Sequence, residues 1–368
     1  MSALPLARAL IRSASVTPAD DGAQAVLAEA LTELGFTVTH LPFGGTPNLF
    51  ARLGTSAPHV CFAGHTDVVP PGDAAWSAAP FAAELRDGVL IGRGACDMKG
   101  AIACFVAAVA SRQGQHGSVS LLITGDEEGP ATDGTVRVLE WMQAAGQIPD
   151  FCLVGEPTNP CALGEVIKIG RRGSLNARIV IDGIQGHTAY PQHADNPVHR
   201  LVAILAALTA TRLDDGSDGF EPSGLQVTSI DVGNPARNVI PACAEAVLNI
   251  RFNDLHSGTS LRAWLAETCA AHAPACRLEV EVSGEAFRTE AGPFVTALSR
   301  AVASQTGMTP RLDTNGGTSD ARFIARYCPV AEFGLVGASM HKADECVPLA
   351  DLDRLTAVYR AFLEELPA

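Results

Sequence analysis

Histidine and carboxylate side chains that directly follow apolar runs are the residues in this sequence best suited to chemistry. His65 and Asp67 come after the apolar stretch 60–64, which ends in glycine. A buried histidine can bind a metal through one ring nitrogen while a nearby carboxylate, here Asp67, holds the other N–H and fixes the ring. One His-x-Asp pattern can also be an ordinary histidine at a strand end, so the interpretation depends on whether further candidates converge on the same place.

Carboxylates occupy the same kind of position in three later segments. They are Asp97 after the glycine-rich turn 92–94, Glu127 and Glu128 after the apolar run 118–124, and Glu156 after the apolar run 151–154. A Gly-x-Gly turn before a helix can also indicate a dinucleotide site, but Asp97 stands where the third glycine is needed and would repel a pyrophosphate. Neighbouring side chains near a strand end point to opposite sides, so one of Glu127 and Glu128 can bind metal while the other faces substrate.

A second histidine, His341, follows the apolar run 328–336. Ligands of an open α/β sheet gather outside the carboxyl ends of its strands, so we expect five candidate ligands to meet at one edge of a sheet. These are His65, Asp97, Glu128, Glu156 and His341. The sequence therefore predicts a metal site built from segments that are far apart along the chain.

The chemistry of these ligands favours two divalent cations. Two histidines and three carboxylates, without a cysteine, suit Zn²⁺, with Co²⁺ or Mn²⁺ as substitutes. Two ions bring about +4 against −3 from the three carboxylates, and one hydroxide would neutralise the remainder. Glu127 then stands beside this water without binding metal, where a general base must lie to take its proton and pass it to a leaving amine. We therefore expect metal-assisted hydrolysis of an amide.

The length, charge and cysteine content of the sequence disfavour several classes of protein. The chain has 368 residues, of which 47% are hydrophobic, and this length suits two domains. Its formal net charge of −14 disfavours binding to nucleic acid or to an anionic membrane, both of which need a basic surface. The N-terminal residues lack a secretion signal and no uncharged run reaches the length of a membrane span, which predicts a cytoplasmic protein. The 10 cysteines form no C-x-x-C pair, so we expect neither a zinc–thiolate cluster nor a disulfide framework.

Hydrophobic periodicity predicts an α/β protein with a second unit inserted into it. Thr17-Pro18 is typical of a helix start and predicts a helix that ends before Gly35. A further helix is expected at 101–112, and strands are expected at 36–41, 48–53, 60–64, 118–124, 151–154 and 328–336.

The segments between Glu156 and His341 follow the order β-α-β-β-α-β. Strands are expected at 174–182, 225–232, 244–252 and 277–282, and helices at 196–212 and 259–272. This is the order of a ferredoxin-like α+β unit, with helices on one face of the sheet. We place this insertion at 173–285, which leaves 1–172 and 286–368 for a discontinuous catalytic domain.

Five motifs carry the candidate ligands. They are Gly64-His65-Thr66-Asp67, the segment from Gly92 to Gly100 with Asp97, Asp126-Glu127-Glu128-Gly129, Gly155-Glu156-Pro157-Thr158 and His341-Lys342. Together they resemble the di-zinc aminoacylase and carboxypeptidase family, over nearly the whole chain. The resemblance implies an aminopeptidase-like di-metal catalytic domain, an inserted dimerisation domain, and two Zn²⁺ per subunit that Co²⁺ can replace.

The same resemblance implies a role for each residue of the metal site. It makes Asp97 the bridging ligand and Glu127 the catalytic acid/base. The remaining ligands form two pairs, His65 with Glu156 and Glu128 with His341. Two departures from the family's usual motifs, Cys96 and Gly125, touch no expected ligand and leave this mechanism intact.

Further motifs are similar to members of the family that act on N-acyl amino acids, and the resemblance assigns substrate binding to seven residues. They are Arg171, Ser174, Tyr190, Asn238, Arg251, Gly317 and Thr318. The resemblance implies a small N-succinyl amino acid as the substrate. An arginine fork suits the carboxylates of such a substrate, although either arginine can instead form a surface ion pair. The resemblance makes His187 an oxyanion-stabilising donor supplied by the partner subunit of a homodimer, and an ordinary loop histidine is the alternative.

Two other functions share most of these features. An enzyme such as acetylornithine deacetylase would have the same metal site and a different acyl pocket. A metal-dependent binding protein with vestigial hydrolytic machinery is the alternative from another class. Such a protein has no need of an unliganded carboxylate beside its water, so Glu127 argues against it.

Overall fold

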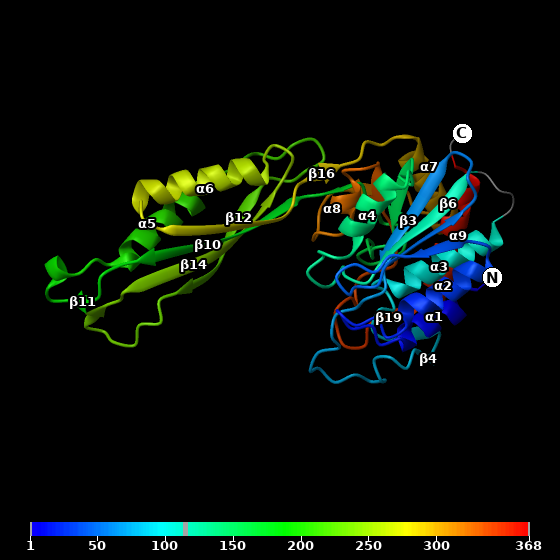
Figure 1. Ribbon diagram of the computed structural model, residues 1–368, viewed down its shortest axis with the longest axis horizontal. Helices are drawn as coiled ribbons and strands as arrows, with labels where there is room; N and C mark the ends of the chain where they lie inside the picture. Colours follow the sequence, from blue (N-terminus) through cyan, green and yellow to red (C-terminus); the bar gives the residue numbers. More distant parts are fainter. Residues whose placement is uncertain (1, 113–116, 367–368) are drawn as a thin grey trace. The chain divides into compact units, whose positions relative to one another are not determined.

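Two compact units make up the chain in the computed structural model, which describes residues 2–112 and 117–366 (Figure 1). The first unit comprises Met1–Gly170, Arg288–Asp313 and Ser319–Ala368, and the second comprises Arg171–Phe287 and Thr314–Thr318. The second unit therefore begins two residues before, and ends two residues after, the insertion expected at 173–285, and it also takes in a short later loop. Residues 1, 113–116, 367 and 368, which fall inside the expected catalytic domain, lie outside the described part.

An eight-stranded mixed sheet forms the centre of the first unit. Its order is β1 (Thr37–His40), β2 (Leu49–Leu53), β6 (Ser118–Thr124), β3 (His59–His65), β7 (Phe151–Val154), β18 (Val330–Glu332), β8 (Val166–Lys168) and β17 (Arg311–Asp313). Strand β3 runs parallel to β6 and β7, and β7 runs parallel to β18. The carboxyl ends of these four strands therefore meet at one edge of the sheet, and the expected α/β class is confirmed.

Helices pack around this sheet in the first unit. They are α1 (Leu4–Arg12), α2 (Ala23–Glu33), α3 (Lys99–Ser111), α4 (Thr135–Ala144), α7 (Pro293–Thr306), α8 (Ala321–Ile324) and α9 (Leu349–Glu364). Helix α3 is buried from Lys99 to Val109, because α1 and α9 pack against it as well as the sheet. Phe62 of β3 stacks on Phe105 of α3 with ring centroids 4.3 Å apart, and Tyr359 packs edge-on against both rings. This core holds β3, and with it the position of His65.

The start of α2 differs from the sequence prediction. We expected it at Thr17-Pro18, but the helix begins at Ala23. The Asp20 side chain accepts hydrogen bonds from the backbone N–H groups of Gly22 and Gln24, which satisfies donors at the true start of the helix. Thr17 instead donates its backbone N–H to the carbonyl of Val68, so this segment lies beside the chain that follows β3.

A separate three-stranded sheet joins two segments of the first unit that are far apart in sequence. It contains β4 (Glu84–Arg86), β5 (Val89–Ile91) and β19 (Cys346–Pro348), in the order β19-β5-β4. Strands β5 and β19 are antiparallel, with Ile91 opposite Cys346. The turn that follows β5 is therefore held close to the segment that precedes β19.

The second unit is an antiparallel four-stranded sheet with two helices. The sheet order is β12 (Gly224–Asp231), β14 (Cys243–Phe252), β10 (Gly173–Asp182) and β15 (Arg277–Gly284), and the helices are α5 (Pro197–Ala210) and α6 (Gly258–His272). Leu175, Ala177 and Ile179 alternate along β10 and are buried with residues of both helices, as expected when one face of a sheet is covered. The predicted β-α-β-β-α-β order and ferredoxin-like strand arrangement are confirmed.

Short elements complete the second unit. A two-stranded ribbon of β11 (Gly186–His187) and β13 (Val239–Ile240) extends from the end of β10, followed by a 3₁₀ turn, η1 (Pro191–His193). The chain enters and leaves the unit through β9 (Gly170–Arg171) and β16 (Phe287–Arg288).

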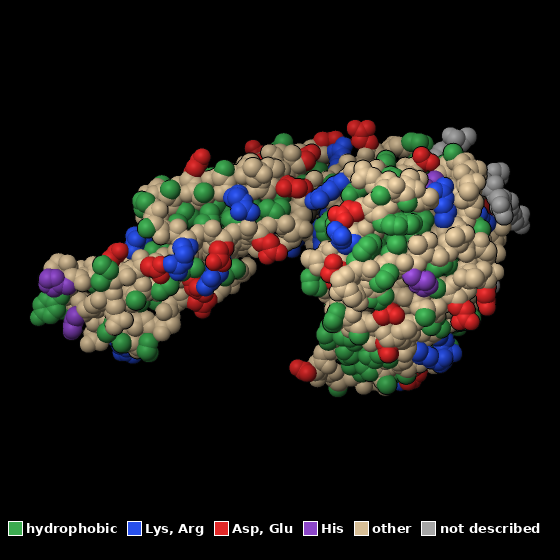
Figure 2. Space-filling model, in the orientation of Figure 1, with side chains coloured by type: hydrophobic (Ala, Val, Ile, Leu, Met, Phe, Trp, Pro, Cys, Tyr) green, Lys and Arg blue, Asp and Glu red, His purple; other side chains and the backbone are tan. Residues whose placement is uncertain are grey.

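Charged side chains of both signs are interspersed on the face of the molecule shown in Figure 2. Within the described residues, no helix has the length and apolar character needed to cross a bilayer.

Candidate metal centre

Strand ends of the first unit position four of the five candidate ligands. His65 is the last residue of β3, Glu128 follows β6, Glu156 follows β7, and His341 lies in the segment after β18. Asp97 arrives by a different route, because it lies in the turn between β5 of the small sheet and the start of α3. The convergence expected from the sequence is therefore produced by two sheets.

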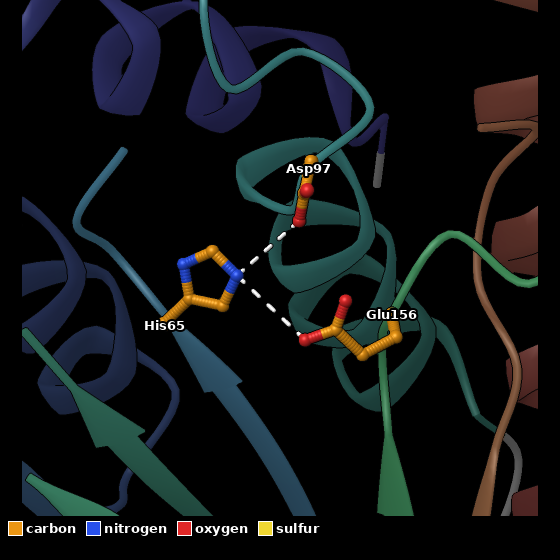
Figure 3. Close-up of side chains that lie close together, drawn as sticks. All are labelled: His65, Asp97 and Glu156. Atoms are coloured by element: carbon orange, nitrogen blue, oxygen red, sulfur yellow. Dashed lines mark hydrogen bonds and ion pairs between the residues drawn. The ribbon is translucent and has the colours of Figure 1, made fainter. Parts of the chain in front are cut away.

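Asp97 lies between the two histidines. Its Oδ1 is 3.3 Å from His65 Nε2, and its Oδ2 is 3.3 Å from His341 Nε2. On the first side, Glu156 Oε1 also lies 3.8 Å from His65 Nε2, so the imidazole faces two carboxylates (Figure 3). On the other side, Glu128 Oε1 lies 3.0 Å from His341 Nε2.

These contacts define two groups of potential metal ligands that share one residue. The groups are His65, Asp97 and Glu156, and Asp97, Glu128 and His341, and within each the ligand atoms lie within 4.8 Å of one another. A third group of the same size contains His65, Glu127 and Glu128. Glu127 therefore lies in the same cluster as the candidate ligands.

The hydrogen bonds of His65 and Asp67 differ from the sequence prediction. His65 Nδ1 lies 2.9 Å from the main-chain carbonyl of Asp67, which can only accept, so Nδ1 carries the proton and Nε2 faces the carboxylates. The Asp67 carboxylate, 3.7 Å from Nδ1, accepts the backbone N–H groups of Glu127 and Glu128 instead. Asp67 therefore orients both the histidine and the loop that carries the two glutamates, because its carbonyl and carboxylate point to different partners.

The buried carboxylates of this cluster strongly attract positive charge. Burial alone would raise the pKa of Asp97, but hydrogen bonds with His341 and His65 lower it well below its usual value. Hydrogen bonds with Asp97 and Glu128 raise the pKa of His341 to about 10. Burial and neighbouring carboxylates raise the pKa of Glu156 well above its usual value and that of Glu127 to about 8. Nearby cations would favour the ionised carboxylates.

The residues present fit a pair of divalent cations. Glu156 Oε1 is buried and, among the described residues, has no hydrogen-bond partner, as expected of an oxygen that serves as a metal ligand. Histidine nitrogens and carboxylate oxygens are ligands that Zn²⁺ and similar ions accept. His341 has a φ of 62°, a left-handed conformation that is uncommon outside glycine and is often found at functional sites.

One group of predicted substrate residues lies at the start of β10 in the second unit. It contains Arg171, Ser174 and Arg251, while Gly317 and Thr318 belong to the loop 314–318 of the same unit, which Arg171 contacts. Ser174 and Arg251 are directly opposite each other on β10 and β14, and the Arg171 guanidinium donates to the carbonyl of Asn315. Burial, and then the nearby charge of Arg172, lower the pKa of Arg251, whose buried Nη1 has no hydrogen-bond partner among the described residues. This end of the unit is suited to an anionic group.

A second group lies on the ribbon beyond the other end of β10. Exposed His187 packs its ring edge-on against Tyr190, with centroids 5.7 Å apart, and the carbonyl of Asn238 accepts the backbone N–H of Thr188. Strand β10 has 10 residues and so spans about 30 Å. Because both groups belong to the same compact unit, one small substrate cannot touch both of them within one chain.

Sequence reasoning missed two carboxylates that support the cluster. Asp126 Oδ2 accepts the backbone N–H groups of Thr132 and Asp133 and shapes the loop after β6. Glu345 accepts the backbone N–H groups of Cys96 and Asp97. Asp126 follows the apolar run 118–124 as Glu127 and Glu128 do, but its role in shaping the loop has no sequence signal, and Glu345 is marked only by its place four residues after His341.

The fold and the site define a metallohydrolase, and comparison with known proteins places the chain in a family. Residues 61–365 match peptidase family M20/M25/M40. This match covers most of the chain, which therefore belongs to that family. A metallo-carboxypeptidase of the family from Sulfolobus solfataricus has the same fold, with a TM-score of 0.80 at 17% identity over 99% of this chain and 98% of that one.

Other relatives share a much higher sequence identity with this chain. A protein named succinyl-diaminopimelate desuccinylase from Gluconacetobacter diazotrophicus is 68% identical over 372 residues, covering 99% of this chain and 97% of its own length. A protein of the same name from Caulobacter vibrioides is 56% identical, covering 97% of this chain and 94% of its own length. A dinuclear metal-binding peptidase from Bacillus subtilis shares the fold, with a TM-score of 0.72 at 17% identity over 98% and 96% of the two chains.

Proposed function

We propose that the chain hydrolyses the amide bond of N-succinyl-LL-2,6-diaminopimelate to succinate and LL-2,6-diaminopimelate, a step of diaminopimelate and lysine biosynthesis. The main observation in favour of metal-assisted hydrolysis is the position of Asp97 between two histidines, each of which faces a further carboxylate. Relatives that share more than half of their residues with this chain carry the name of this activity.

Five residues would hold two zinc ions. His65 and Glu156 would bind one ion, Glu128 and His341 the other, and Asp97 both, because its two oxygens face different histidines. When bound, such ions supply Lewis acidity that activates a water and polarises the amide carbonyl. Co²⁺ would occupy the same ligands, because it accepts the same nitrogen and oxygen donors.

Glu127 would transfer the proton. It lies in the same cluster as His65 but is not required by either ligand group that contains Asp97. Burial raises its pKa to about 8, and a carboxylate whose pKa lies near neutrality both accepts a proton from water and returns it to a leaving amine. The Asp67 carboxylate holds the backbone of Glu127 and so helps to fix its position.

The second unit would bind the substrate and the partner subunit. Arg171 and Arg251 would hold carboxylates of the N-succinyl amino acid, because a guanidinium pairs with a carboxylate through two parallel hydrogen bonds. His187 would donate a hydrogen bond to the oxyanion. Since the arginine group and the ribbon lie at opposite ends of β10, both can act on one substrate only if they come from different subunits, which supports a homodimer.

Removal of the metal ions should abolish hydrolysis. We expect that dialysis against a chelator will stop the release of succinate from N-succinyl-LL-diaminopimelate and that added Zn²⁺ will restore it. Elemental analysis of the restored protein should give about two ions per chain. Turnover that persists in the chelator would contradict the proposed chemistry, and saturation at one ion would contradict the shared role of Asp97.

A further inference from the structure

A buried carboxylate outside the proposed ligand set holds the turn that carries Asp97. Glu345 is 0% exposed. Its Oε1 accepts the backbone N–H groups of Cys96 at 3.0 Å and Asp97 at 3.1 Å, and its Oε2 accepts Arg93 Nη1 at 2.7 Å. Both oxygens of the carboxylate are therefore used in fixing the chain immediately before α3.

Arg93 extends this arrangement to a third segment of the first unit. It is 1% exposed, and its Nη2 lies 3.3 Å from the carbonyl of Pro70 and 3.4 Å from that of Pro71. Its guanidinium also lies over the ring of Trp76 at 5.2 Å. Arg93 and Glu345 thus compensate each other's buried charge, and their hydrogen bonds connect three loops.

The backbone around Glu345 joins the two sides of the metal cluster. Its own carbonyl accepts the N–H of Gly92 at 2.9 Å, and the next residue begins β19, which pairs with β5. His341 lies four residues earlier in the same segment. The Glu345 side chain therefore links the turn that bears Asp97 to the segment that bears His341. The distance between Asp97 and His341 decides whether Asp97 can face this histidine as well as His65.

We propose that Glu345 is a positioning residue for the two-metal centre, an inference that rests on the proposed function. By accepting two consecutive N–H groups, it fixes the backbone of Asp97, and by its place in the chain it holds that backbone against the His341 segment. Arg93 orients the Glu345 carboxylate through the hydrogen bond from its Nη1. The alternative is a structural ion pair that stabilises the fold and has no influence on metal binding.

The two explanations differ in what happens to metal affinity in folded protein. We expect Glu345→Met, which keeps the length of the side chain but removes both acceptors, to weaken the binding of at least one Zn²⁺ by about 10- to 100-fold, the usual effect of removing a partner that orients a ligand. Affinity is measured by competition with a chromophoric chelator, and circular dichroism of the metal-free protein verifies folding. The visible spectrum of the Co²⁺-loaded protein should change as well, because the orientation of Asp97 changes.

A double variant keeps the test decisive if Glu345→Met does not fold. In Arg93→Gln/Glu345→Gln the amide oxygen at position 345 can still accept the two N–H groups, and the two amides can bond to each other. We expect Zn²⁺ affinity within about threefold of wild type in this variant, and a larger loss in Glu345→Gln alone, where the positive charge of Arg93 has no buried partner. A double variant that binds Zn²⁺ as weakly as the single one would contradict the positioning role.

Asp214→Asn provides a matched control in the second unit. Asp214 is a partly buried carboxylate that accepts the backbone N–H groups of Gly216 and Ser223, as Glu345 does for Cys96 and Asp97. Its replacement should lower thermal stability and leave Zn²⁺ affinity unchanged. Wild-type affinity in folded Glu345→Met, or equal losses in Glu345→Met and Asp214→Asn, would overturn the inference. Failure of the proposed function would be recognised separately, since wild-type protein would then bind Zn²⁺ without hydrolysing the succinyl substrate.

Discussion

Glu127→Gln is expected to keep both metal ions and to lose turnover by at least roughly 10²-fold, the contribution typical of a general base. The amide has nearly the same shape as the carboxylate but cannot accept the proton of the attacking water. The loss should appear in kcat, because Glu127 acts on the reacting water and not on substrate binding. Elemental analysis and steady-state kinetics on the same preparation measure both quantities.

Glu128→Gln is the matched comparison for this variant. Glu128 Oε1 lies 3.0 Å from His341 Nε2, whereas Glu127 is not needed by either ligand group that contains Asp97. We therefore expect Glu128→Gln to lower metal occupancy. Equal metal loss in the two variants would mean that the roles of these neighbouring carboxylates have been assigned wrongly.

Mixed dimers of two inactive variants are expected to recover activity. Neither His187→Ala nor Glu127→Ala homodimers should work appreciably if His187 acts on the partner's site. When subunits exchange freely in an equal mixture, about half of the dimers are hybrids, and each hybrid has one site with an intact Glu127 and an intact His187 from its neighbour. The mixture should therefore show about a quarter of the wild-type activity per site.

The same experiment distinguishes this arrangement from one within a single chain. If His187 acted within its own chain, every site in the mixture would lack one of the two residues. Subunit exchange has to be verified, for example by a mass-labelled variant, before activity is measured. Verified exchange with no regained activity would rule out the contribution from the partner subunit.

Much of the architecture could be predicted because burial leaves simple patterns. Strands β3, β6 and β7 are buried on both faces, so each is an unbroken apolar run that stops where polar residues begin. Such strands are parallel and central, which made the meeting of His65, Glu128 and Glu156 predictable. In the second unit only one face of the sheet is covered by helices, and the resulting alternation along β10 and β14 revealed its strands.

Other features depend on contacts that no local pattern reveals. The start of α2 is set by the pairing of Thr17 with Val68 and by the Asp20 side chain, and not by the proline that follows Thr17. Whether His65 bonds to the carbonyl or to the carboxylate of Asp67 depends on where the β6 loop lies. Glu345 meets Asp97 only because β19 pairs with β5, a contact between segments about 250 residues apart. The assignment of metal and substrate roles to individual residues stays a prediction.

The most direct test of the proposed function is a comparison of kcat/KM for N-succinyl-LL-diaminopimelate and N-acetylornithine with the same Zn²⁺-loaded protein. A site whose arginines bind an acyl carboxylate should reject an acyl group that lacks one, because buried donors are then left unpaired. We expect kcat/KM for the succinyl substrate to exceed that for the acetyl substrate by at least about 10²-fold. Comparable values for the two substrates, or a preference for the acetyl group, would contradict the proposed function.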